Sequence, residues 1–167
     1  KLYIHFMYIK RIVIEYIGIM IADGVIANSP EIIEGIEKYY KPKNKKIAVI
    51  NTCVNTDFWK QIDLNREAKT IFFAGRLAKR KGLDVLFQAI NHLIKVDNEI
   101  KLVVAGAESS EESFKWGYDY VKNNNLENNI SFIGHVNRDD IRDWYNKVSV
   151  FVLPSNQEGS PRVVKEA

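Results

Sequence analysis

Short apolar runs alternate with longer amphipathic segments along most of the chain, and this alternation strongly limits the folds available to it. Runs of strand length lie at residues 24–28, 46–50, 70–75, 100–106, 130–134 and 149–153. Between two of them, residues 82–96 carry apolar side chains with the i, i+3, i+4 spacing of one helix face: Leu83, Leu86, Phe87, Ile90, Leu93 and Ile94. Such alternation predicts an α/β fold with a parallel sheet and helices on both faces.

Local signals divide the chain further. Ser29 and Pro30 begin a helix that ends near Tyr40, before Lys41-Pro42. The segment from 61 to 69 is polar and aperiodic, which indicates a linker. We therefore expect the end of one domain at 1–60, the linker at 61–69, and a Rossmann-like domain at 70–167, truncated at both ends.

Residues 1–22 are very apolar but are interrupted by Lys10, Arg11 and Glu15. Their uncharged stretches are far shorter than the roughly 20 residues of a membrane span. We expect a helix that is buried in the truncated first domain but loses some of its packing partners here, which leaves apolar surface exposed. A helix lying on a membrane surface is the alternative.

Charge and cysteine content exclude several classes of function. The 167 residues include 24 basic and 21 acidic side chains, interspersed, for a net charge of +3. Nucleic-acid binding is therefore not expected. The one cysteine, Cys53, is expected to be buried, and the spacing of Cys and His residues matches no zinc site. We expect no metal and no cofactor. His5 and His92 lie in helical segments and are expected to be structural or exposed.

Parallel sheets bind ligands at the carboxyl ends of their strands, so the loops there are the first place to look for a site. The loop after Gly75 contains four cations, including Arg76 and Lys81, and leads through Gly82 into a helix. Cations beside a helix N-terminus suit a phosphate or diphosphate, and Gly82 permits close backbone approach. A solvated basic loop is the alternative. Neither a G-x-G-x-x-G nor a P-loop motif occurs.

A second candidate loop follows Leu153. Glu158 lies in this loop, and Glu166 lies on the helix that begins at Ser160-Pro161. Two carboxylates here can accept hydrogen bonds from sugar hydroxyls, whereas surface carboxylates are the alternative. His135 follows another strand end and is a further candidate to line the cleft.

Taken together, these segments resemble the retaining, nucleotide-sugar-dependent glycosyltransferases of family 4, which have the two-domain GT-B fold. The resemblance rests on ADGVIANSPEIIEGI, IFFAGRLAKRKGLDVLFQAI, IKLVVAGAE, ISFIGHV, VSVFVLPS and EGSPRVVKEA, in this order. The most specific parts are G-R-L-x-x-x-K-G and the E-x7-E that follows P-S. Members often read proline-asparagine-glycine-valine at the domain junction, where this chain reads residues 50–54, INTCV.

The resemblance implies a role for each matching residue. Arg76 and Lys81 would neutralise the donor diphosphate, Glu166 would hold the ribose, and Glu158 would be the catalytic contact with the donor sugar. Backbone contacts to sugar or phosphate are implied for the next five residues: Gly159, Ser160, Pro161, Arg162 and Val163. The residues after Gly134, His135 and Val136, would border the base.

The implied reaction is transfer of a hexose from a nucleoside-diphosphate sugar to a glycan or lipid-linked acceptor. Alternatives are a sugar-nucleotide epimerase of the same fold and a non-catalytic nucleotide-sugar-binding module. We expect a role in polysaccharide biosynthesis and a cytoplasmic location, with peripheral contact to the cytoplasmic face of a membrane as an option. Because the acceptor domain is nearly absent, we expect the chain alone to be inactive.

Overall fold

Two units make up the chain, and they divide between Thr52 and Cys53. The computed structural model describes residues 2–43 and 45–167, with the side chains of all of these except residues 2–8 and Glu111. His5 therefore lies outside the described side chains.

The division precedes the predicted linker at 61–69. Residues before that linker belong with the second unit because their aromatic side chains pack on it. The Trp59 ring lies 5.8 Å from the Tyr145 ring, and the Arg138 guanidinium lies 4.2 Å from the centre of the Phe58 ring. Residues 67–69 are also not linker, since they begin a strand.

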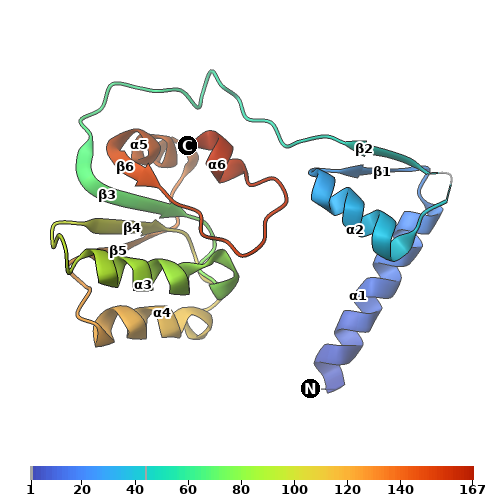
Figure 1. Cartoon of the computed structure of the whole chain (residues 1–167), viewed down its shortest axis with the longest axis horizontal. Coiled ribbons are helices and arrows are strands. Elements are labelled where there is room, and N and C mark those ends of the chain that lie inside the picture. Colours follow the sequence, from blue (N-terminus) through green and yellow to red (C-terminus); the bar gives the residue numbers. More distant parts are fainter. Residues whose placement is uncertain (1, 44) are drawn as a thin grey trace. The chain divides into compact units, whose positions relative to one another are not determined.

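The first unit is a helix followed by a strand–helix–strand motif: α1 (Leu2–Ile21), β1 (Gly24–Ala27), α2 (Pro30–Tyr40) and β2 (Lys46–Val49) (Figure 1). The two strands pair in parallel, with Gly24 opposite Lys46. As predicted, Pro30 occupies the first turn of α2, which ends where Lys41 adopts a left-handed conformation. Tyr40 fixes α2 to α1, since its hydroxyl donates to Glu15 Oε2 at 2.9 Å.

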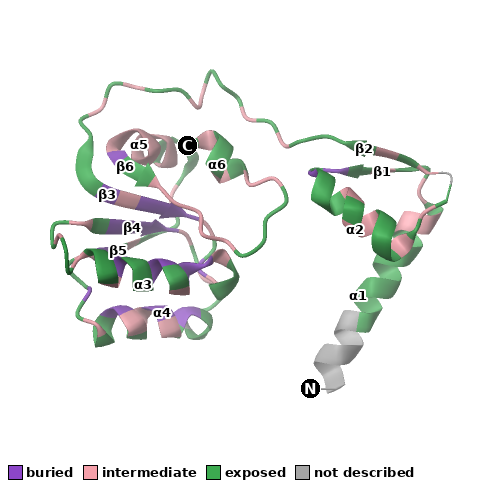
Figure 2. Ribbon diagram, in the orientation of Figure 1, coloured by how far each residue is buried: buried purple, intermediate pink, exposed green. Residues whose placement is uncertain are grey.

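The predicted apolar helix forms as α1, and the expected loss of packing partners leaves apolar surface exposed at residues 9–21. None of these residues is buried (Figure 2), and Ile14 remains 59% exposed. The physical reason is that two short strands and one other helix cannot cover an apolar helix on all sides. In the described part of the chain, no helix combines the length and apolar character that crossing a membrane requires.

The second unit is a four-stranded parallel sheet with strand order β5-β4-β3-β6. Its elements are β3 (Glu67–Ala74), the 3-10 helix η1 (Lys79–Lys81), α3 (Leu83–Leu93), β4 (Lys101–Ala105), α4 (Glu111–Asn123), β5 (Ile130–Gly134), α5 (Arg138–Lys147), β6 (Val148–Phe151) and α6 (Arg162–Glu166). The predicted strand and helix segments all form, within a few residues of their expected bounds.

Helices cover both faces of this sheet, which confirms the predicted fold class. On one face, α3 and α4 enclose a core around Phe87, Phe114 and Leu102 (Figure 1). On the other face, Trp144 and Tyr145 of α5 pack against a second core that contains Phe72. Cys53 contributes to neither core. It is exposed, contrary to prediction, because it lies between β2 and β3 in a segment without regular structure.

The loops after β3 and β6 touch at Gly82. This residue has φ +71°, and a Cβ there would lie 2.0 Å from the Pro154 carbonyl oxygen. The Asn156 N–H also donates to the Arg80 carbonyl oxygen at 3.2 Å. Gly82 therefore lies against the backbone of the loop after β6, and its close approach to a phosphate stays a prediction.

Replacing Gly82 should test this contact. Gly134 has nearly the same φ, +70°, but nothing lies within 4 Å of the position that a Cβ would take there. We expect Gly82→Ala to lower the free energy of unfolding by about 2–5 kcal/mol, from backbone strain plus steric overlap. Gly134→Ala should cost about 1–2 kcal/mol, from strain alone. Urea unfolding measures both, and equal costs would show that the contact with Pro154 is unimportant.

Candidate functional site

Two of the loops singled out in the sequence leave the sheet at its topological switch point. From β3 the chain moves to β4 and β5 on one side, and then returns to β6 on the other side of β3. Open parallel sheets bind ligands at the carboxyl ends of the two strands flanking such a point. The residues that follow β3 and those that follow β6 are thus placed where this architecture forms sites.

An ion pair joins these two loops. The Lys81 ammonium donates to Glu158 Oε1, across 77 residues of sequence. The two side chains are 16% and 25% exposed, respectively. The structure therefore brings Lys81, Gly82 and Glu158 together at the ends of β3 and β6.

The surroundings of Glu158 keep it ionised. Partial burial acts to raise the pKa of Glu158, but the Lys81 hydrogen bond, the adjacent Ser155 hydroxyl and the charges of Lys81 and Arg80 outweigh it. The pKa of Glu158 consequently lies below its ordinary value. At neutral pH this group is a carboxylate, suited to accept hydrogen bonds and unsuited to donate a proton.

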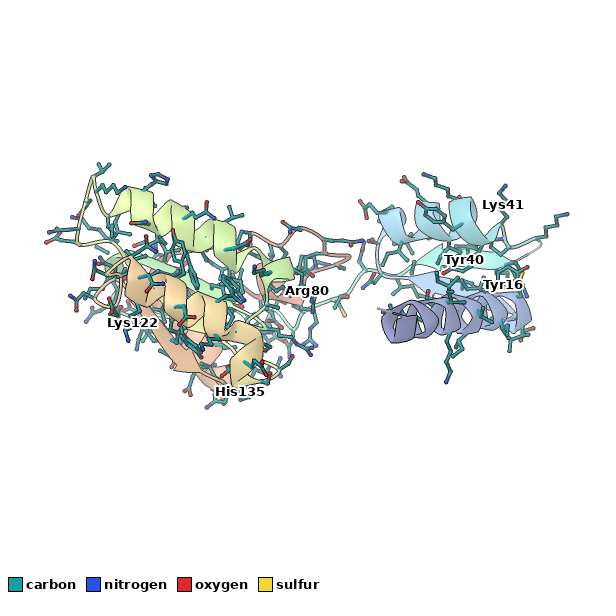
Figure 3. The ribbon with its side chains drawn as sticks, turned by 90° about the horizontal axis from the view of Figure 1, so that it is seen from below. Tyr16, Tyr40, Lys41, Arg80, Lys122 and His135 are labelled. Carbon is teal, nitrogen blue, oxygen red and sulfur yellow. The ribbon has the colours of Figure 1, made fainter. Side chains whose placement is uncertain are left out.

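The four cations of the loop after β3 have different surroundings. Lys79 lies 5.3 Å from the centre of the Trp116 ring on α4, and Lys81 pairs with Glu158. Arg76 and Arg80 are both exposed. Figure 3 shows Arg80 beside the loop that follows β6, in agreement with the Asn156–Arg80 backbone hydrogen bond.

The N-terminus of α3 contributes less to anion binding than the sequence suggested. Three of the four loop cations form the 3-10 turn η1 immediately before α3, and the first turn of α3 already carries the acidic Asp84. Asp84 will interact with the positive end of the helix dipole. The cationic side chains, rather than the helix dipole, are thus the main feature that favours an anion here.

Glu166 lies apart from the Lys81–Glu158 pair. Its side chain is 9% exposed, with Arg162 Nη2 3.4 Å from Oε1. The end of α6 packs towards α5, where Glu166 lines a hollow of about 190 Å³ with Arg66, Arg142 and Tyr145. Burial, and secondarily the Glu166 charge, raise the pKa of Tyr145. The structure does not bring the two glutamates to one spot.

His135 and Val136 lie at another place along the same sheet edge. They line a hollow of about 350 Å³ with residues of α5 that include Asp140 and Lys147, and His135 is exposed (Figure 3). β5 is two strands from β3, a separation of about 10 Å. Of the five residues for which backbone contacts are predicted, Gly159, Ser160 and Pro161 precede α6, whereas Arg162 and Val163 begin it. The Ser160 hydroxyl accepts from Lys165 at 2.7 Å.

Sequence reasoning missed several of the site's neighbours. Pro154 and Ser155 follow β6 after Val152 and Leu153, in the loop that the sequence had singled out, but no role was predicted for them. Trp116 carried no such signal, because only folding brings α4 to Lys79. Over the described residues, no three His, Cys, Asp or Glu side chains are grouped so that they could hold a metal ion.

Comparison with known proteins identifies the family. Residues 55–167 match the family described as glycosyl transferases group 1. The chain belongs to this family. It is 27% identical to a D-inositol 3-phosphate glycosyltransferase of Streptomyces avermitilis over 173 residues, which cover 94% of this chain and 37% of that protein.

Solved structures of glycosyltransferases share the fold. A sucrose-phosphate synthase from Thermosynechococcus elongatus superposes with a TM-score of 0.80 at 21% identity, covering 94% of this chain and 41% of that one. HepE from Anabaena, in complex with UDP and glucose, gives 0.72 at 20% identity, with 87% and 42% covered. These likenesses show the GT-B type of fold. The chain spans about two fifths of each of these proteins.

The ion pair leads to a prediction about the pKa of Glu158. The Lys81 hydrogen bond is the interaction that most strongly lowers the pKa of Glu158. Lys81→Met removes it while the raising effect of burial remains, so the pKa of Glu158 should rise. Carbon-detected NMR titration of the glutamate carboxyl groups measures this. The matched variant Lys122→Met removes an exposed cation from α4 and should leave the pKa unchanged.

The same shift has a consequence for stability. Because folding lowers the pKa of Glu158, its stabilising contribution is complete above the unfolded pKa, about 4.3, and is lost as pH falls through the folded value. Lys81→Met should therefore lose less stability than the wild type across that acidic range. An unchanged pKa in Lys81→Met would show that the ion pair does not persist in solution.

Proposed function

We propose that this chain is the donor-binding part of a glycosyltransferase that moves a hexose from a nucleoside-diphosphate sugar to a glycan or lipid-linked acceptor, with retention of configuration. The observation that carries the proposal is the Lys81–Glu158 pair at the switch point of a group 1 glycosyltransferase sheet. A cation and an ionised carboxylate from facing loops suit a ligand that is anionic at one end and rich in hydroxyls at the other.

Each end of the donor has a proposed partner. Arg76 and Lys81 bind the diphosphate, since charge-assisted contacts to phosphate are the strongest hydrogen bonds that side chains make. Glu158 accepts hydrogen bonds from hydroxyls of the donor sugar, close to the bond that breaks. The backbone from Gly159 to Val163 contacts phosphate or sugar on the same side.

The cations also supply the chemistry of the leaving group. As the glycosidic bond breaks, negative charge builds on the diphosphate, and fixed positive groups stabilise that charge in the transition state. Arg76 and Lys81 are in the right loop for this role, and the proposal includes no metal ion. Glu158 remains ionised, so its role is electrostatic and positional.

The nucleoside contacts complete the proposal. Glu166 holds the ribose, and His135 and Val136 border the base. Since Glu166 lies against α5 in this structure, a ribose contact requires its side chain or α6 to move when the donor binds. HepE was solved with UDP and glucose, which makes UDP the first ligand to test.

The acceptor side belongs to the whole protein. The chain spans 37% of the length of the inositol-phosphate relative, and we propose that its first unit is the end of an acceptor-binding domain. The chain alone then binds donor without transferring sugar. We place the parent enzyme in the cytoplasm, with peripheral membrane contact. The relatives named above are transferases and synthases, which gives no support to the epimerase alternative.

Binding measurements test the diphosphate contacts. Arg76→Ala and Lys81→Ala should each weaken UDP and inorganic pyrophosphate about tenfold or more, because each loses a charge-assisted contact worth about 1.5–3 kcal/mol. Lys122→Ala removes an exposed cation from α4 and should have no effect (Figure 3). Isothermal titration calorimetry with the 167-residue chain measures all three variants.

A second arm of that titration tests the ribose contact. Glu166→Ala should weaken UDP but not pyrophosphate, which lacks a ribose. If both ligands weaken equally, Glu166 acts on the fold instead. If UDP, GDP and ADP all fail to bind the wild type, the donor-binding proposal is wrong.

A further inference from the structure

We propose that Lys81 exchanges partners when a nucleoside diphosphate binds, passing from the Glu158 carboxylate to the diphosphate, and that Glu158 thereby disfavours the bare diphosphate relative to the sugar donor. This inference rests on the proposed function and adds a specificity role to Glu158. It starts from the observation that two residues proposed to bind different parts of the donor bind each other in this structure.

The Glu158 carboxylate and the diphosphate compete for the Lys81 ammonium. The ammonium already has an anion as its partner, so a diphosphate must either displace Glu158 or bring its own charge close to that carboxylate. Both cost free energy, since like charges at close range repel. A diphosphate wins the competition because it offers more charge and more acceptor oxygens than one carboxylate.

The backbone around the pair restricts what can move. Gly82 lies against the Pro154 carbonyl, and the Asn156 N–H donates to the Arg80 carbonyl oxygen, so the two loops are held together independently of the ion pair. Exchange therefore needs only rotation of the Lys81 and Glu158 side chains. Both are partly exposed, which leaves room for that rotation.

Arg80 stabilises the Glu158 carboxylate after Lys81 has left it. Its positive charge already acts on the Glu158 carboxylate from the same loop as Lys81. When Lys81 turns to the diphosphate, Arg80 remains close to the freed carboxylate. A donor sugar then gives Glu158 hydroxyl groups to accept from, whereas a bare diphosphate leaves it with no new partner.

This difference makes Glu158 a determinant of specificity. The sugar donor recovers part of the lost ion-pair energy through its hydroxyls, and the bare diphosphate recovers none. The product of transfer is thus held less tightly than it would be without Glu158, which favours its release.

The test is calorimetric titration of UDP into the 167-residue chain. Glu158→Gln keeps the size of the side chain but removes the charge, and it should bind UDP about fivefold more tightly, equivalent to about 1 kcal/mol. Glu127→Gln makes the same change in net charge at an exposed position between α4 and β5, and should leave affinity unchanged.

A double variant separates exchange from simple repulsion. In a Lys81→Ala background there is no ion pair to break, so adding Glu158→Gln should improve UDP affinity by less than about twofold, the remainder being direct repulsion. An equal gain in both backgrounds, or no gain in the wild type, overturns the exchange. If UDP binds the wild type and Lys81→Ala weakens it, that result leaves the proposed function standing. Failure of UDP, GDP and ADP to bind any variant overturns both.

Discussion

The contact between the loops after β3 and β6 is the constraint on which the candidate site depends. Gly82 lets one loop pass against the Pro154 carbonyl, and this approach places Lys81 within reach of Glu158. Neither loop alone presents both charges. The parallel sheet supplies the setting, because β3 and β6 are neighbours whose carboxyl ends emerge together. The site thus depends on the order of the strands, which places the two loops side by side, as well as on the charged residues that the loops carry.

Local signals predicted much of this architecture. The helix start at Pro30, the buried run of β4 and the apolar face of α3 are each encoded in a few neighbouring residues, and all three formed. The two site loops were also found from sequence, since parallel strands send their carboxyl ends to one edge. Side-chain partners were not predictable in the same way. Lys79 meets Trp116, and Glu166 turns towards α5, through contacts that depend on packing between distant segments.

How far the helix of the first unit is buried could not be predicted from its own residues. An apolar helix predicts that something covers it, but the cover depends on how much chain surrounds the helix. In this unit two strands and α2 leave residues 9–21 without a buried member. The domain boundary shows the same limit. The polar segment at 61–69 looked like a linker, whereas Phe58 and Trp59 pack on the second unit through contacts with Arg138 and Tyr145.

The central claim is that the loops flanking the switch point bind the diphosphate end of a nucleotide-sugar donor. The most direct measurement is mapping of backbone amide shifts in the isotope-labelled chain as UDP is added. The account predicts that the largest shifts occur at residues 75–82 and 154–160, with smaller ones near His135. Shifts confined to the first unit, or no shifts at ligand concentrations well above those of the protein, would contradict it.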